Sequence, residues 1–255
     1  MIRRAAALLL LLLAACAAPP PPFPIGPMVI GDSAPVQFAG TQPTRLPVRG
    51  MDAARFQQYV DWPRAKAVGI EFVFLKATEG GDLLDPKFRD HWRGADRADI
   101  ARGAYHFYYF CTAPEVQAQW FIRNVPRTRG SLPPVLDMEW NPFSPTCQRR
   151  PDAATIRAEM QRWLDIVTAH YGQRPLIYTT PGFYKDAQLN RLQGYEFWLR
   201  TTAKTPRQAY PGQPWRFWQY TATGTLPGTP GDIDINAFNG TETQWKNWKA
   251  ERQIR

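Results

Sequence analysis

Eight short apolar segments, each a candidate β-strand, recur along this chain. They cover residues 47–51, 71–76, 103–109, 134–138, 175–179, 195–199, 216–220 and 233–237. Stretches with helical periodicity separate the earlier segments, whereas the connections after residue 175 are rich in Pro and Gly and too broken for full helices. Strands that alternate with helices are typical of a parallel sheet. We therefore expect an α/β fold, an irregular (β/α) TIM-like barrel with a helix-poor second half.

The clearest helical pattern covers residues 152–171. Asp152 can cap its first turn, and Gly172 can adopt the left-handed conformation that ends a helix. The apolar positions repeat with the spacing of one helix face: Ile156, Met160, Trp163, Leu164 and Val167. This segment is predicted to pack as one amphipathic helix.

The first residues have the pattern of a secretory signal. Arg3 and Arg4 precede 11 consecutive Ala and Leu residues, fewer than the roughly 20 that span a bilayer. The sequence Leu-Ala-Ala-Cys at 13–16 resembles the bacterial lipobox, where cleavage precedes a cysteine that is then acylated. We expect residues 1–15 to be the signal peptide and Cys16 to be the lipidation site. An ordinary cleavage site beside an incidental cysteine is the alternative.

Residues 16–45 are rich in proline and poor in charge. Such a segment favours a semi-rigid polyproline spacer that does not pack. We therefore predict an anchor and tether at 16–45, a catalytic domain at 46–245 and a C-terminal tail at 246–255. The anchor would attach the protein to a membrane. Some bacterial lipoproteins carry an Asp after the lipidated cysteine, which retains them at the inner membrane, whereas this chain has Ala17. The outer membrane, with the domain facing the periplasm, is therefore preferred.

The chain is basic, with 31 Lys+Arg against 22 Asp+Glu and a formal charge of +9. Removal of residues 1–15 takes away two arginines and no acid, which leaves +7. A cationic exported protein is attracted to anionic polymers such as cell-wall glycans, nucleic acid or lipid headgroups. An Arg-rich composition spread over a solvated surface is the alternative, and it is favoured. Basic runs interleaved with aromatics are absent from the sequence, so no nucleic-acid partner is expected. Metal-ligand spacings and phosphate-binding loops are absent too, and we expect a monomer without a cofactor or metal.

Two cysteines remain beyond Cys16. In an oxidising compartment, an even number of cysteines favours pairing. We predict a disulfide between Cys111 and Cys147, which are 36 residues apart. Two free buried thiols are the alternative.

Acidic residues stand where several predicted strands end: Asp52, Glu79, Asp137, Glu139 and Asp234. The carboxyl ends of barrel strands converge on one mouth, so these side chains are predicted to share a cleft. Asp137 and Glu139 are so close that both cannot ionise freely, and one should keep its proton near neutral pH. A protonated acid beside a carboxylate is what hydrolysis of a glycosidic bond requires. Taken singly, each acid could instead cap a helix or pair with an arginine.

Aromatic residues also gather at the strand ends: Tyr105, Trp140, Tyr178, Trp198 and Trp218. Sugar rings stack on aromatic faces through their CH groups, although buried aromatics more often belong to a core. Together with the acids, they indicate a carbohydrate substrate.

Seven segments resemble, in order, the motifs of family 25 glycoside hydrolases, which are N-acetylmuramidase lysozymes. They are Gly50-Met51-Asp52, Lys76-Ala77-Thr78-Glu79-Gly80, Gly103-Ala104-Tyr105-His106-Phe107, Leu136-Asp137-Met138-Glu139, Ile177-Tyr178-Thr179, Trp218-Gln219-Tyr220-Thr221 and Asp232-Ile233-Asp234-Ile235-Asn236-Ala237-Phe238. The resemblance runs from about Val48 to Gly240. It implies cleavage of the β-1,4 bond between N-acetylmuramic acid and N-acetylglucosamine in peptidoglycan, with retention, on an incomplete β/α barrel.

The resemblance also implies roles for the catalytic residues. Glu139 matches the general acid/base. Asp137 matches the second carboxylate, either a nucleophile or the group that orients the substrate's acetamido carbonyl. Asp52 and Asp234 match further acids of the cleft. One departure is Ala53-Ala54, where the family usually has a β-branched residue and Ser, which puts the support of Asp52 in doubt.

Five other residues match positions that contact sugar in the family: Lys76, Tyr105, Tyr178, Trp218 and Gln219. His106 could touch substrate or serve as a structural histidine. The sequence thus predicts a membrane-tethered muramidase. A non-catalytic peptidoglycan-binding lipoprotein, and a glycosidase of another N-acetylhexosamine polymer such as chitin, are the alternatives.

Overall fold

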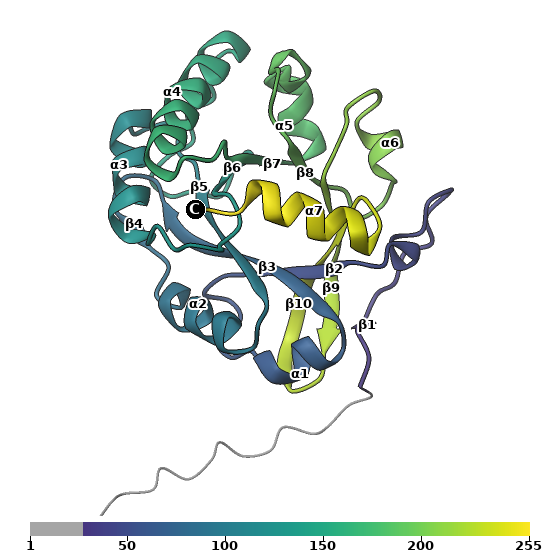
Figure 1. The fold of residues 1–255 in the computed structure, drawn as a ribbon. Helices are drawn as coiled ribbons and strands as arrows, with labels where there is room; N and C mark the ends of the chain where they lie inside the picture. Colours follow the sequence, from purple (N-terminus) through teal and green to yellow (C-terminus); the bar gives the residue numbers. More distant parts are fainter. Residues whose placement is uncertain (1–27) are drawn as a thin grey trace, which may run out of the picture.

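The strands of the computed structural model, which describes residues 28–255, form a closed barrel (Figure 1). The predicted signal peptide, Cys16 and the first part of the predicted tether lie outside the described residues. Eight strands pair around the ring in chain order, and the last pairs again with the first. They are β2 (Arg49–Ala53), β3 (Ile70–Glu79), β5 (Ala101–Phe107), β6 (Val135–Met138), β7 (Leu176–Thr179), β8 (Phe197–Arg200), β9 (Phe217–Leu226) and β10 (Thr229–Phe238). The expected barrel of eight strands is confirmed.

The direction of the last strand sets this barrel apart from a regular (β/α) barrel. Neighbouring strands from β2 round to β9 are parallel, whereas β10 is antiparallel to both β9 and β2. Only Pro227 and Gly228 separate β9 from β10, and Gly228 has a φ of 74°. A connection this short can only reverse the chain, because a parallel neighbour needs a crossover of a dozen or more residues.

Helices cover the first half of the barrel much more completely than the second. The early ones are α1 (Trp62–Ala67), α2 (Phe88–Arg97), α3 (Pro114–Asn124) and α4 (Ala153–Tyr171). Later connections hold only α5 (Pro181–Asp186) and α6 (Pro206–Ala209), with the 3-10 turn η2 (Leu189–Arg191). The predicted helix-poor second half is therefore confirmed. Helix α4 begins and ends as expected, since the Asp152 carboxylate accepts hydrogen bonds from the amides of Ala154 and Thr155, and Gly172 is left-handed.

Aromatic side chains fill the barrel interior, and helix α7 (Glu242–Arg252) closes one end of it (Figure 1). Because β10 is antiparallel, α7 follows it at the end where the parallel strands begin. Trp245 lies 5.4 Å from Phe72 and Trp248 lies 5.1 Å from Phe217, measured between ring centroids. The domain boundary predicted at residue 246 thus falls inside a helix that packs on the core.

Part of the predicted tether also contacts the barrel. Strand β1 (Gly31–Asp32) pairs with the outer part of β9, and the 3-10 turn η1 (Pro43–Arg45) leads into β2. Phe38 is buried, with its ring 4.9 Å from that of Trp218. Apolar contacts, strand pairing and hydrogen bonds such as that from the Thr223 hydroxyl to Asp32 thus hold this proline-containing segment on the domain. The short strand β4 (Leu83–Leu84) pairs with the end of β3.

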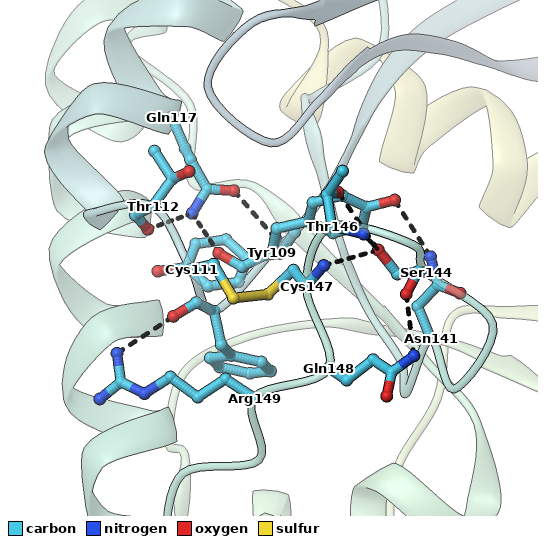
Figure 2. The surroundings of a disulfide bond; sticks show 12 residues. Tyr109, Cys111, Thr112, Gln117, Asn141, Ser144, Thr146, Cys147, Gln148 and Arg149 are labelled. Carbon is cyan, nitrogen blue, oxygen red and sulfur yellow. Dashed lines mark hydrogen bonds between the residues drawn. A yellow bond between two sulfur atoms is a disulfide. The ribbon is translucent and has the colours of Figure 1, made fainter.

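The predicted disulfide is confirmed (Figure 2). Cys111 and Cys147 are bonded, with their Cα atoms 5.7 Å apart. The bond joins the segment after β5 to the long loop after β6. Hydrogen bonds hold both sides, since the Gln117 amide donates to the carbonyls of Tyr109 and Thr112, and Arg149 donates to the carbonyl of Phe110. No helix within residues 28–255 has the length and apolar character needed to cross a membrane.

Trp248→Ala is expected to lower the free energy of unfolding by about 3–5 kcal/mol, because it opens a cavity at the closed end of the barrel. It also removes the hydrogen bonds that the indole NH donates to Glu196. Lys246→Ala, on the exposed face of the same helix, should change stability by less than about 0.5 kcal/mol. Chemical denaturation measures both, and equal effects of the two variants would contradict a structural role for α7.

Candidate active site

Four carboxyl groups meet in a cleft of about 480 Å³ at the end of the barrel where the parallel strands finish. Asp52 comes from β2, Asp137 from β6, Glu139 from just beyond β6, and Asp234 from β10. Residues far apart in the chain are therefore brought together as the sequence predicted. Asp52 and Asp137 are buried, while Glu139 and Asp234 are partly exposed.

Strand register and the alternation of side chains place these acids. Asp234 lies directly opposite Asp52 across the β10–β2 pair. Asp137 lies beside Tyr178 of β7. Successive residues of a strand face opposite sides, so Leu136 and Met138, which flank Asp137, pack against the surrounding helices instead. Barrel strands thus carry polar residues inward at one end and apolar residues outward.

Two amide side chains hold the Asp52 carboxylate. Gln219 and Asn236 donate hydrogen bonds to its Oδ1 atom at 2.9 and 2.7 Å. The orientation of each amide is set in turn, because its own oxygen accepts a hydrogen bond: Tyr178 donates to Gln219 at 2.9 Å and Trp198 donates to Asn236 at 2.7 Å. With each oxygen occupied in this way, the NH₂ groups face Asp52. This network supports Asp52 even though Ala53 and Ala54 follow it.

Burial dominates the protonation of the Asp52 and Asp234 pair. It raises the pKa of Asp52 well above its usual range, and the nearby Asp234 raises it further, while the two amide donors act in the opposite direction. Burial also raises the pKa of Asp234, to about 6, although the charge of Arg200 opposes this. The pair therefore holds protons more tightly than ordinary aspartates do.

The second pair, Asp137 and Glu139, behaves similarly. Burial raises the pKa of Asp137 well above its usual range, and the neighbouring Glu139 carboxylate adds to that rise. No hydrogen-bond partner for Oδ1 of Asp137 exists among residues 28–255. Burial also raises the pKa of Glu139, against the charges of Arg200 and Lys76. The pair therefore holds a proton more tightly than free carboxyls do, which is the property that a general acid needs.

Lys76, which lines the cleft, forms an ion pair with Glu79 behind it. The Lys76 ammonium donates to Glu79 at 2.5 Å, and the Tyr109 hydroxyl donates to the other oxygen of Glu79. Burial alone would raise the pKa of Glu79, but the attraction of Lys76 lowers it overall. Glu79, expected to join the other acids, instead holds Lys76 and does not line the cleft.

Four of the five predicted sugar-contacting residues line the cleft: Lys76, Tyr105, Tyr178 and Gln219. The exception is Trp218, which the structure places in the outer core. Its side chain is fully buried, packs on Phe38, and donates from its indole NH to the carbonyl of Thr201 at 2.8 Å. Because Gln219 faces inward, its strand neighbour Trp218 must face outward. Trp140 also lies outside the cleft, where it packs on Phe183.

His106 is structural. It is buried, its Nε2 atom lies 3.0 Å from Oε1 of Gln117, and its Nδ1 atom lies 2.8 Å from the Thr78 hydroxyl. The amide oxygen of Gln117 can only accept, so Nε2 carries the proton. Burial lowers the pKa of His106 to about 4, which keeps the ring neutral.

Sequence reasoning left out several residues that shape the cleft. Asn236 supports Asp52, Arg200 adds a cation, and Phe56 stands at the rim with 73% of its surface exposed. Strand alternation is the signal that could have found two of them. Asn236 follows Asp234 by two residues and Arg200 follows Trp198 by two, so each shares the inward face. Within residues 28–255, no cluster of His, Cys, Asp or Glu could hold a metal ion.

Asp234→Asn is expected to stabilise the protein at pH 7. The pKa of Asp234 rises from 3.8 to about 6 in the folded state, so the folded protein binds the proton more tightly and loses stability as the pH rises through this interval. The amide removes that loss, with a gain of about 1–3 kcal/mol at pH 7 that largely disappears near pH 4. Thermal or urea unfolding at both pH values, with exposed Asp82→Asn as the control, measures this difference. Destabilisation at pH 7 would contradict it.

Comparisons with known proteins agree with this geometry. The sequence profile of "Glycosyl hydrolases family 25" matches residues 51–229. "Uncharacterized protein YegX" of Escherichia coli O157:H7 is 32% identical over 212 residues, which cover 81% of this chain and 75% of that protein. "Lysozyme M1" of Streptomyces globisporus is 33% identical over 208 residues, which cover 76% and 68%. The structure of a family 25 glycosyl hydrolase from Bacillus anthracis has a TM-score of 0.73 at 29% identity, covering 83% of this chain and 97% of that one. The chain therefore belongs to glycosyl hydrolase family 25 and is a glycoside hydrolase.

Proposed function

We propose that this enzyme is a peptidoglycan hydrolase, a 1,4-β-N-acetylmuramidase that cleaves between N-acetylmuramic acid and N-acetylglucosamine. The observation that carries the proposal is the pair of proton-retaining carboxyls, Asp137 and Glu139, in the cleft of a family 25 hydrolase. Similarity to a protein named lysozyme supports this substrate class.

In the proposed reaction, Glu139 protonates the glycosidic oxygen as the bond to the anomeric carbon breaks. Burial raises the pKa of Glu139, so this residue holds its proton more tightly than a free glutamate does. Asp137 stabilises the positive charge that develops at the anomeric carbon, either by bonding to it or by orienting the acetamido carbonyl of the sugar. Water then attacks the anomeric carbon from the face that the leaving group occupied and gives a proton to Glu139. The configuration is therefore retained.

The remaining cleft residues position the sugar. Asp52, held by Gln219 and Asn236, offers a polar group in a fixed position in the cleft. The exposed ring of Phe56 at the rim can stack on the apolar face of a sugar. Because this polar group and the aromatic ring are already in place, the protein loses less conformational freedom when a glycan strand binds.

The proposal includes export and attachment to a membrane through a lipid on Cys16, with the domain facing the wall in the periplasm. The signal-like residues 1–15 support export, and the Cys111–Cys147 disulfide supports an oxidising compartment. Mass spectrometry of the mature N-terminus tests the anchor, and an unmodified Cys16 thiol would contradict it.

Glu139→Gln is expected to lower the release of reducing ends from purified peptidoglycan by about 10²–10⁴-fold, while binding to the glycan persists. Exposed Glu251→Gln is the matched control and should retain wild-type activity. Binding by the wild type without any hydrolysis would favour a non-catalytic wall-binding role. Hydrolysis of chitin but not of peptidoglycan would favour the other glycosidase activity.

A further inference from the structure

Arg200 brings a positive charge into the cleft beside the catalytic carboxyls. It is the last residue of β8, paired with Gln219 of β9, and it lines the same cleft as Glu139 and Asp234. Its charge opposes the burial that raises the pKa of both acids. The guanidinium therefore lies close to the reacting groups.

The two cations of the cleft differ in how the protein engages them. Lys76 is bound to Glu79. For the Arg200 guanidinium, residues 28–255 supply no hydrogen bond or ion pair, and the bond from Tyr210 goes to its backbone carbonyl at 2.7 Å. Arginine stays charged and carries five N–H donors in a planar fork. Such a group in a substrate cleft is available to an acceptor on the substrate.

None of the acids among residues 28–255 forms an ion pair with this guanidinium. Asp52, Glu139 and Asp234 all retain protons more tightly than free carboxyls do, because they are buried. A carboxylate brought by the substrate can therefore pair with this guanidinium without displacing an ion pair of the protein. An arginine–carboxylate pair can form two parallel hydrogen bonds, which adds direction to the attraction.

We propose that Arg200 binds the free lactyl carboxylate of N-acetylmuramic acid, so that the enzyme prefers glycan strands without stem peptides. This inference rests on the proposed muramidase function. The lactyl group is attached to C3 of the ring, only two carbons from the anomeric carbon that must lie against Glu139 and Asp137. Its carboxylate therefore stays near the catalytic acids, where Arg200 lies. The carboxylates of a stem peptide extend away from the ring.

The preference places the enzyme after another reaction. In peptide-linked strands the lactyl carbonyl forms an amide with the peptide and carries no charge. Hydrolysis of that amide consumes one water molecule, releases the peptide with a free amine and leaves the lactyl carboxylate. The class of reaction that supplies the preferred substrate is therefore hydrolysis of the bond between the lactyl group and the stem peptide.

The test compares kcat/KM on three matched preparations of glycan strands: peptide-linked, peptide-free, and peptide-free with the lactyl carboxylate capped as a methylamide. Wild type should prefer the uncapped peptide-free strands by about 10-fold or more, mainly through KM, because a charge-assisted pair is lost from the other two. Capping separates the effect of charge from the loss of peptide bulk.

Variants of Arg200 locate the effect. Arg200→Gln should bring the ratio between uncapped and capped strands close to one, whereas Arg200→Lys should keep part of it, since lysine retains the charge without the planar fork. Three results would overturn the proposal: a wild-type preference for peptide-linked strands, equal rates on capped and uncapped strands, or an Arg200→Gln variant that keeps the preference. A shift of the pH profile with the preference intact would assign Arg200 to positioning of the acids.

Failure of the muramidase proposal is distinguishable from failure of this one. If wild type cleaves none of the strands, the muramidase proposal fails. Calorimetric titration of Glu139→Gln with soluble uncapped and capped strands then still tests the carboxylate site. Adding Arg200→Gln to that variant should weaken binding of the uncapped strands by about 10–100-fold and leave the capped strands little changed. Equal binding of both strand types would reject the site.

Discussion

The antiparallel strand β10 is the constraint on which the barrel and its site both depend. It fills the space between β9 and β2 and so closes the ring. It also brings Asp234 opposite Asp52 and carries Asn236 to the Asp52 carboxylate. The same reversal of direction sends the chain to the other end of the barrel, where α7 covers the aromatic interior. One short turn at Gly228 therefore determines both the open, acidic end and the closed, apolar end.

The open end is built at a cost in stability. Four carboxyl groups share a buried cleft, and burial raises the pKa of each. The chain offsets part of this cost with the amides of Gln219 and Asn236, and with two cations. Asp137 has less support, since one of its oxygens is buried without a partner among the described residues. In a buried site of low effective dielectric, such a carboxyl interacts more strongly with charge on a bound substrate than it would in water.

Local patterns explain why much of the site was predictable. An acid directly after an apolar run marks the end of a barrel strand, and this rule located Asp52, Asp137, Glu139 and Asp234. The limits of the rule are equally physical. Glu79 also follows an apolar run, but Lys76, three residues earlier, holds it in an ion pair. Trp218 stands in a recognisable motif, yet the alternation of β9 turns it outward onto Phe38, a residue of the predicted spacer.

The sequence by itself determined the eight strands, the helix over 153–171 with its caps, and the acids at the strand ends, because periodicity and capping depend only on nearby residues. The direction of β10, the packing of α7 and residues 31–45, and the hydrogen bonds around Asp52 were decided by tertiary structure. So was the state of Arg200, whose guanidinium has no bonded partner among the described residues. Each of these depends on the register between strands that are far apart in the chain, and register is set only when the barrel closes.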